Sequence, residues 1–241
     1  MKTFSFLQDW WQFVILALIS YFVGCFNFAV TISKFKKRDI TKIGSGNPGT
    51  MNMTREFGIG IGLMTFFCDA FKGILPTVAA YLIYRDYVFT GTAVLTADFA
   101  KHFAMVFVVI GHIFPVTMKG KGGKGIATVL GAFWASLTCE SGWFALIGLG
   151  ILIGLVIFIF FTEWGSLGSM TGVSSFSIIQ AVIFCNRYAL ADINAYLVCT
   201  FAFIIILNFL TWFAHRSNVV RLFAGEEHRT SFKKMAKKKQ R

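Results

Sequence analysis

The sequence predicts an all-α protein that crosses a membrane about seven times, with its N-terminus outside and its C-terminus in the cytoplasm. Hydrophobic residues make up 56% of the 241 residues and charged residues only 14%, whereas a soluble domain has about 45–50% apolar and about 25% charged residues. The apolar residues form runs, and a membrane-spanning helix needs about 20 such residues. The positive charges lie between and after these runs, as in cytoplasmic loops.

Seven apolar segments account for most of the chain. The first begins after Trp10 and follows no charged segment, so we interpret it as a retained span and not as a signal peptide. The fourth is short, and the sixth is rich in serine. The predicted spans are 11–33, 60–84, 88–114, 126–138, 143–161, 168–185 and 191–213.

The basic segments predict the orientation of these spans. The formal net charge is +12, and lysine and arginine cluster after the first span, after the third span and at the end of the chain. With seven spans all three clusters lie on one side, which the positive-inside rule places in the cytoplasm. We expect a single integral membrane domain over residues 1–225 and a basic cytoplasmic tail over residues 226–241. Basic clusters beside spans contact anionic membrane lipids, so no nucleic-acid partner is expected.

The five cysteines lie in or at the ends of apolar segments, and no Cys-x-x-Cys pair occurs. Cysteines in this setting behave as small buried apolar residues. We therefore expect no metal and no cofactor.

The loop from Gly44 to Arg55 is polar and rich in glycine. Glycine lets the backbone approach an anion closely, and successive amide N–H groups form an anion-binding nest. An arginine binds phosphate through two parallel hydrogen bonds. A flexible polar loop is the alternative, but the hydroxyl, amide and guanidinium groups together favour phosphate binding. The candidate binding residues are Gly44, Ser45, Gly46, Asn47, Gly49, Asn52 and Arg55.

A second glycine-rich loop, Lys-Gly-Gly-Lys-Gly, precedes the fourth apolar segment. Its N–H groups, its two ammonium charges and the positive end of the following helix converge, which suits a phosphate. The loop lacks the spacing of a P-loop and the Ser or Thr after its last lysine, so nucleotide hydrolysis is not expected. The candidate binding residues are Lys121, Gly122, Gly123, Lys124 and Gly125.

Charged residues also occur inside the predicted spans. Asp69 and Lys72 are three residues apart and share a helix face, and Asp98 and Lys101 repeat this spacing. Intramembrane charges face the bundle interior or a cavity. We interpret both as neutralising ion pairs, with a proton pathway as the alternative.

The seventh span ends with His215 and Asn218 on one helical face. Together they could line a polar site at the membrane surface. Alone they are also compatible with an ordinary helix end, where arginines complement the free carbonyl groups.

Taken together, these motifs resemble the bacterial acyl-phosphate:glycerol-3-phosphate acyltransferase family, PlsY. The family's Gly-Ser-Gly-Asn…Arg loop matches 44–55, its Gly-His-x-x-Pro…Lys-Gly-Gly-Lys-Gly…Ala-Thr stretch matches 111–128, and its His-Arg-x-Asn…Arg-Leu…Gly-x-Glu stretch matches 215–227. An Asp-x-x-Lys-Gly motif at 69–73 and a Ser-Leu-Gly-Ser turn at 166–169 also match. The chain departs from the family pattern at Thr41, Gly120 and Glu163.

The resemblance implies transfer of a fatty acyl group from acyl phosphate to the 1-hydroxyl of glycerol 3-phosphate. The products are 1-acylglycerol 3-phosphate (lysophosphatidic acid) and phosphate, in the first acylation step of phospholipid synthesis. It implies an active site at the cytoplasmic face of the bacterial cell membrane. It adds four binding residues, which are His112, Thr128, Ser169 and Glu227. The implied catalytic residues are Ser45, Ser166, His215 and Asn218. Which loop binds which phosphate stays open, as do the oligomeric state and the acyl chain length.

The His-x4-Asp signature of soluble acyltransferases is absent from the sequence. We therefore expect positioning and electrostatics to dominate, with the phosphate of the donor accepting the hydroxyl proton. His215 as general base is the alternative. Two other classes are less well supported. A transporter often shows inverted repeats, which are not visible here, and a CDP-alcohol phosphotransferase needs an aspartate-rich metal motif that is missing. A scaffold without enzymatic activity would leave the polar loops unexplained.

Overall fold

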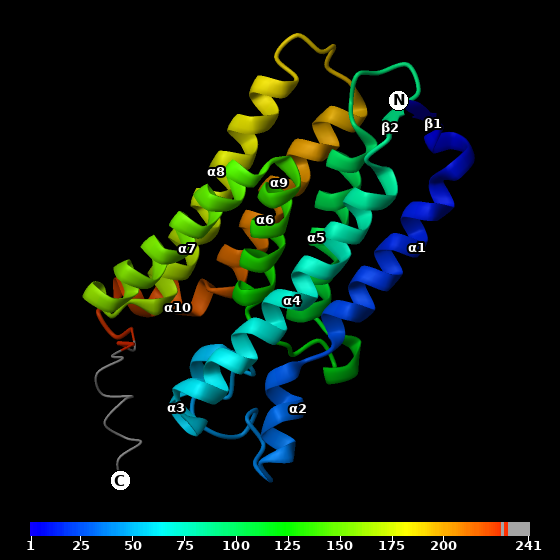
Figure 1. The fold of residues 1–241 in the computed structure, drawn as a ribbon. Coiled ribbons are helices and arrows are strands. Elements are labelled where there is room, and N and C mark those ends of the chain that lie inside the picture. The colour runs from blue at the N-terminus through cyan, green and yellow to red at the C-terminus, as the bar shows by residue number, and fades with distance from the viewer. Residues whose placement is uncertain (228, 231–241) are drawn as a thin grey trace.

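The apolar segments form helices that run along one axis of the molecule in a computed structural model (Figure 1). The structure describes residues 1–227, 229 and 230. Among these residues, six helical segments are long and apolar enough to cross a membrane. They are α1 (Phe6–Cys25) with α2 (Phe28–Phe35), α4 (Ile59–Tyr84), α5 (Thr96–Ile113), α7 (Gly142–Thr162), α8 (Gly165–Arg187) and α9 (Ala195–Ala214).

The fourth apolar segment is α6 (Ile126–Glu140), which has only 15 residues. It lies at the centre of the bundle and most of its residues are buried. The predicted helical membrane fold is confirmed. A seventh crossing by α6, with the N-terminus outside, stays a prediction.

Two short strands were not predicted. β1 (Lys2–Phe4) and β2 (Tyr87–Phe89) pair in parallel at the N-terminal end of the bundle. The third apolar segment was predicted to be helical from residue 88, but α5 begins at Thr96. Aromatic and β-branched residues favour the extended conformation, and Gly91, with a φ of +74°, turns the chain after β2.

The described basic segments, which follow the first, third and seventh apolar segments, lie at the end of the bundle opposite the N-terminus (Figure 1). This end carries α2, α3 (Thr50–Phe57), the 3₁₀ turn η1 (Val116–Met118) and α10 (Arg216–Phe223). Of the predicted tail, residues 228 and 231–241 lie outside the described residues. The backbone N–H of Thr230 donates to the carbonyl of Glu163 at 2.6 Å, so described contacts continue past the predicted boundary at residue 225.

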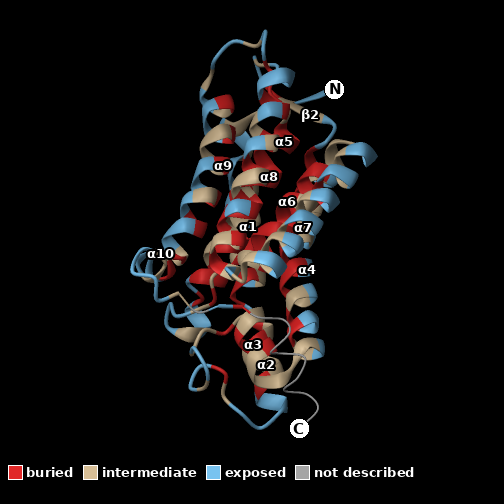
Figure 2. Ribbon diagram, turned by 90° about the vertical axis from the view of Figure 1, so that its left-hand side faces the viewer, coloured by how far each residue is buried: buried red, intermediate tan, exposed pale blue. Residues whose placement is uncertain are grey.

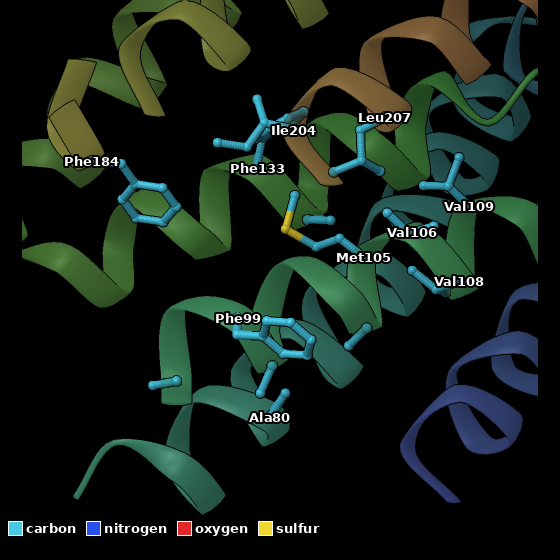
Figure 3. Packing of buried hydrophobic residues seen from close by; sticks show 14 of the residues in the cluster. Ala80, Phe99, Met105, Val106, Val108, Val109, Phe133, Phe184, Ile204 and Leu207 are labelled. Carbon is cyan, nitrogen blue, oxygen red and sulfur yellow. The ribbon is translucent and has the colours of Figure 1, made fainter. Parts of the chain in front are cut away.

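The core lies between α5, α6, α8 and α9, and α7 forms an outer face (Figure 2). In α5 the most apolar stretch is 72% buried, whereas in α7 it is 6% buried. Phe133 of α6, Met105 of α5 and Leu207 of α9 pack together at the centre (Figure 3). The exposed apolar face of α7 is suited to lipid.

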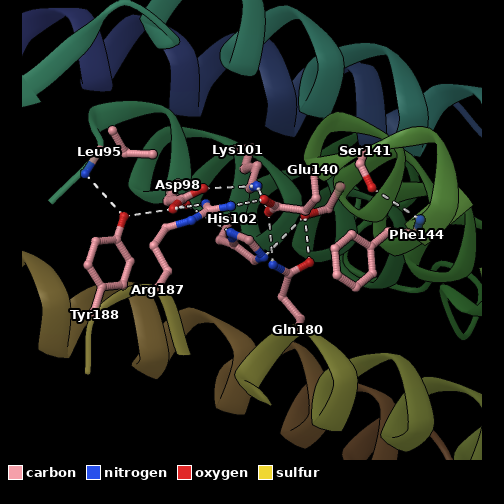
Figure 4. Close-up of polar contacts among 11 residues, drawn as sticks. Leu95, Asp98, Lys101, His102, Glu140, Ser141, Phe144, Gln180, Arg187 and Tyr188 are labelled. Atoms are coloured by element: carbon pink, nitrogen blue, oxygen red, sulfur yellow. Dashed lines mark hydrogen bonds and ion pairs between the residues drawn. The ribbon is translucent and has the colours of Figure 1, made fainter. Parts of the chain in front are cut away.

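Both predicted intramembrane ion pairs are present. Asp69 and Lys72 lie 3.1 Å apart, and Asp98 and Lys101 lie 3.0 Å apart. The second pair belongs to a larger network (Figure 4), which lies where α5 begins and α6 ends. There Glu140 pairs with Lys101, and Arg187 pairs with Asp98 at 2.6 Å and with Glu140. The network joins α5, α6 and α8, which favours the ion-pair interpretation.

Candidate functional site

The first glycine loop folds around the side chain of Asn52. This side chain is 1% exposed, accepts the backbone N–H of Ser45 at 3.0 Å and donates to two loop carbonyls. Gly44 and Gly46 have φ values of +58° and +69°, a region that favours glycine. Asn52 therefore fixes the conformation of the loop from its buried side. The other predicted loop residues before α3 are exposed or partly exposed: Gly44, Ser45, Gly46, Asn47 and Gly49.

Arg55 lies on α3, the short helix that follows the first loop. Its side chain is partly buried, and this burial lowers the pKa of Arg55 from its usual value. The carboxylates of Glu227 and Glu56 act in the opposite direction. An arginine stays charged under these conditions. Glu227 lies in the C-terminal segment, so a charge from a distant part of the chain acts on Arg55.

The second glycine loop packs directly against the first. A Cβ atom on Gly123 would lie 2.3 Å from Nε2 of His112 and 3.0 Å from the carbonyl oxygen of Pro48. His112 and Thr128 are buried, and their Nδ1 and Oγ1 atoms lie 3.3 Å apart. These two residues support the loop from inside the bundle. Lys121, by contrast, is exposed.

A polar cluster joins the second loop to α8, α10 and the C-terminal segment. Lys124 Nζ donates to Asn218 Oδ1, and Asn218 Nδ2 donates to Glu227 Oε1 at 2.6 Å. Ser166 Oγ donates to the same carboxylate oxygen at 2.8 Å, and Arg221 Nε donates to Glu227 Oε2 at 3.0 Å. The carboxylate of Glu227 therefore holds three side chains in place.

The cluster carries an excess of positive charge. Burial lowers the pKa of Lys124 to about 8; Glu227 opposes this shift, while Arg221 and Arg55 add to it. Burial alone would raise the pKa of Glu227, but hydrogen bonds from its three partners hold it below the usual range. Glu227 is therefore ionised at neutral pH. Among the described residues of the cluster, the cations Arg55, Lys124 and Arg221 share this carboxylate, so the site favours an additional anion.

His215 is buried at the end of α9, beside this cluster. Its Nδ1 atom lies 2.9 Å from the carbonyl oxygen of Thr211. Because a carbonyl oxygen only accepts, Nδ1 carries the hydrogen and Nε2 is left as an acceptor. Burial, and then the charge of Lys124, lowers the pKa of His215 to about 4. The imidazole is therefore neutral at neutral pH.

Of the two predicted serines in α8, Ser166 belongs to the cluster. Ser169 Oγ donates to the carbonyl oxygen of Gly165 at 2.8 Å, within its own helix. The structure thus brings together Arg55, Lys124, Ser166, His215, Asn218 and Glu227.

A family model described as glycerol-3-phosphate acyltransferase matches residues 14–225. The chain belongs to this family. A glycerol-3-phosphate acyltransferase of Mycoplasma mobile is 35% identical, over 93% of this chain and 95% of that protein. One of Finegoldia magna is 36% identical, over 89% of this chain and 94% of that protein.

Solved structures agree with this assignment. A crystal structure of PlsY, an integral membrane glycerol 3-phosphate acyltransferase, matches in its glycerol 3-phosphate form with a TM-score of 0.71 and 28% identity. The match covers 90% of this chain and 95% of that one. The lysophosphatidic acid form matches with a TM-score of 0.70. The chain is thus a multi-pass integral membrane acyltransferase.

Arg221 was not predicted to be a site residue, although it belongs to a matched motif of the acyltransferase family. Arg221 lies three positions after Asn218 on α10, so the two side chains share a helix face. Its place in this motif was the sequence signal that could have identified Arg221 as a site residue. What the sequence did not show is that the chain turns after α10 and brings Glu227 back to both residues.

Proposed function

We propose that this acyltransferase transfers a fatty acyl group from acyl phosphate to the 1-hydroxyl of glycerol 3-phosphate, releasing phosphate and forming lysophosphatidic acid. The observation that carries the proposal is the excess of positive charge around Glu227, beside two glycine loops in contact. Both substrates carry phosphate, and the donor also carries an acyl chain. An enzyme that joins them needs anion-binding groups at the membrane surface and apolar helices alongside.

Each glycine loop supplies one phosphate-binding wall. In the first, Ser45, Asn47 and Arg55 act with the backbone N–H groups of the loop. Arg55 binds glycerol 3-phosphate through two parallel hydrogen bonds. In the second, Lys121 and Lys124 act with the glycine N–H groups at the start of α6. The glycerol 3-phosphate and lysophosphatidic acid forms of the similar PlsY structure support this choice of acceptor and product.

Other predicted site residues support the two phosphate-binding loops from their buried side. The buried side chains of Asn52, His112 and Thr128 hold the two loops in shape. Ser166 and Asn218 fix the carboxylate of Glu227, and Asn218 also holds the ammonium group of Lys124. A preorganised set of charges stabilises a transition state without reorganising during the reaction.

The reaction needs no covalent enzyme intermediate. The hydroxyl oxygen of glycerol 3-phosphate attacks the acyl carbonyl carbon, and the bond from this carbon to the phosphate oxygen breaks. The hydroxyl proton passes to the departing phosphate. His215 Nε2 accepts a hydrogen bond from the 2-hydroxyl group of glycerol 3-phosphate and so orients this substrate, while Lys124 and Arg55 offset the negative charge. Holding two reactants in this geometry supplies much of the rate.

We place this site at the cytoplasmic face of the bacterial cell membrane. The support is the collection of the described basic segments at the end of the bundle that carries both loops (Figure 1). Membrane lipids surround the apolar helices and supply the route by which the product leaves.

Product analysis tests the proposal. Purified protein is incubated with acyl phosphate and labelled glycerol 3-phosphate, and the lipid product and released phosphate are measured. We expect 1-acylglycerol 3-phosphate and phosphate in equal amounts. Phosphate release without acylated product would contradict the proposal. Uptake of glycerol 3-phosphate into liposomes without acyl transfer would support the transporter alternative.

A further inference from the structure

The first membrane segment is interrupted inside the bundle. Helix α1 ends at Cys25, and α2 begins at Phe28. The last carbonyl groups of a helix have no donor within that helix. Where water is scarce these groups must find donors elsewhere in the protein. The break therefore needs partners from neighbouring helices.

Side chains from two other elements supply these partners. Lys72 Nζ, on α4, donates to the carbonyl oxygens of Gly24 at 3.2 Å and Phe26 at 2.7 Å. Thr117 Oγ1, in η1, donates to the carbonyl oxygen of Cys25 at 3.2 Å. Three consecutive carbonyl groups are thus bound by side chains from distant parts of the chain.

The charge of Lys72 is balanced locally. Asp69 lies one helical turn earlier on α4, with Oδ1 3.1 Å from the ammonium group. Both side chains are almost completely buried. This ion pair leaves two ammonium hydrogens for the carbonyl groups, because a lysine has three donors.

The break is connected to the first glycine loop by the next residue. Asn27 caps α2 by accepting the backbone N–H of Val30 at 3.0 Å, and its Nδ2 donates to the carbonyl oxygen of Pro48 at 3.3 Å. That carbonyl is the group that Gly123 of the second loop approaches closely. A displacement of the backbone at Phe26 is therefore transmitted to the contact between the two loops through a single residue, Asn27.

We propose that Lys72 is a positioning residue of the acyltransferase site. It fixes the break between α1 and α2, and through Asn27 it sets the position of the Gly44–Arg55 loop. This inference rests on the proposed phosphate-binding role of that loop. Lys72 does not touch substrate in this account.

Lys101 provides a matched control. It is another buried lysine with an aspartate three residues before it, at 3.0 Å. Its ion partners are Asp98, in the first turn of α5, and Glu140, at the end of α6 (Figure 4). Its loss removes a buried ion pair without touching the break or the loops.

The test compares Lys72→Met, Asn27→Ala, the double variant and Lys101→Met in the full-length protein. Hydrogen exchange of residues 44–57 and both substrate KM values are measured. We expect Lys72→Met and Asn27→Ala each to raise exchange in this segment and to raise the KM for glycerol 3-phosphate about tenfold, since small misplacements of binding groups are costly. The double variant should be no worse than the more severe single one, and Lys101→Met should leave both measures unchanged.

The outcomes distinguish the positioning role of Lys72 from the proposed phosphate-binding role of the loop. Unchanged exchange of residues 44–57 in Lys72→Met, or an equal rise in Lys101→Met, overturns the positioning role. If Lys72→Met does not fold, additive effects cannot be tested, and Asn27→Ala decides: unchanged exchange in that variant also overturns the role. Raised exchange with an unchanged KM overturns the assignment of the loop to glycerol 3-phosphate instead.

Discussion

Lys124 donates a hydrogen bond to Asn218 across 94 positions of sequence. This contact joins the second glycine loop to α10, the short helix after the last membrane segment. Asn218 in turn donates to Glu227, which also binds Ser166 and Arg221. The site thus depends on groups from four separate parts of the chain.

Arg55→Lys should raise the KM for glycerol 3-phosphate about tenfold, because an ammonium group cannot form two parallel hydrogen bonds to a phosphate. Steady-state kinetics with varied acceptor measures this. Arg38→Lys is the control, since Arg38 is exposed and pairs with Glu56 at the surface. An unchanged KM in Arg55→Lys would exclude Arg55 from the acceptor site.

The pH dependence of activity should reflect the ionisation of Lys124. Its pKa is lowered to about 8, so the ammonium form predominates below this pH and is lost as pH rises through it. The kcat/KM value reports ionisations of the free enzyme and should therefore fall above about pH 8. Lys124→Arg should move this fall to higher pH, because arginine stays charged. Lys121→Arg, at an exposed position, should not move it. A fall that is identical in all three proteins would assign it to another group.

Substitution of His215 distinguishes a hydrogen-bond acceptor from a general base. Glutamine keeps an acceptor oxygen, so His215→Gln should retain kcat within about tenfold, whereas His215→Phe should lose about 100-fold or more. The pKa of His215 is about 4, so we also expect no loss of activity near pH 6.5, where an unperturbed histidine titrates. Equal losses of about 1,000-fold in both variants would identify His215 as the base.

Gly73→Ala should destabilise the protein. A Cβ atom there would lie 2.1 Å from the backbone carbonyl oxygen of Thr128, where α4 and α6 pack closely. Overpacking of this kind costs about 1–3 kcal/mol. Gly150→Ala in α7 is the matched control, because its Cβ would meet no atom within 4 Å. Thermal unfolding in detergent measures the Tm of both variants. Equal Tm values would show that α4 and α6 do not pack closely at Gly73.

The sequence predicted the parts of the site whose chemistry lies in residue type. The structure brings the two glycine loops together and places Lys124 beside Asn218 and His215, as the polar residue types beside apolar segments indicated. Their binding and catalytic roles stay predictions. The helical membrane fold followed from hydropathy for the same reason.

Residues that act through tertiary contact were predicted less well. Asn52 and His112 were expected to bind substrate, which stays a prediction, and the sequence did not show that both side chains are buried behind the loops. The break at Asn27, the strand pair and the joining of Glu140 to Lys101 depend on which helices are neighbours. Periodicity shows which face of a helix is apolar and not what that face meets.

The identity of the acyl donor is the central claim. A single measurement tests it most directly. Initial rates of acyl transfer to labelled glycerol 3-phosphate are compared for acyl phosphate, acyl-CoA and acyl carrier protein thioester of the same chain length, with one preparation of the purified protein. We expect 1-acylglycerol 3-phosphate from acyl phosphate alone. Comparable rates with either thioester would contradict it.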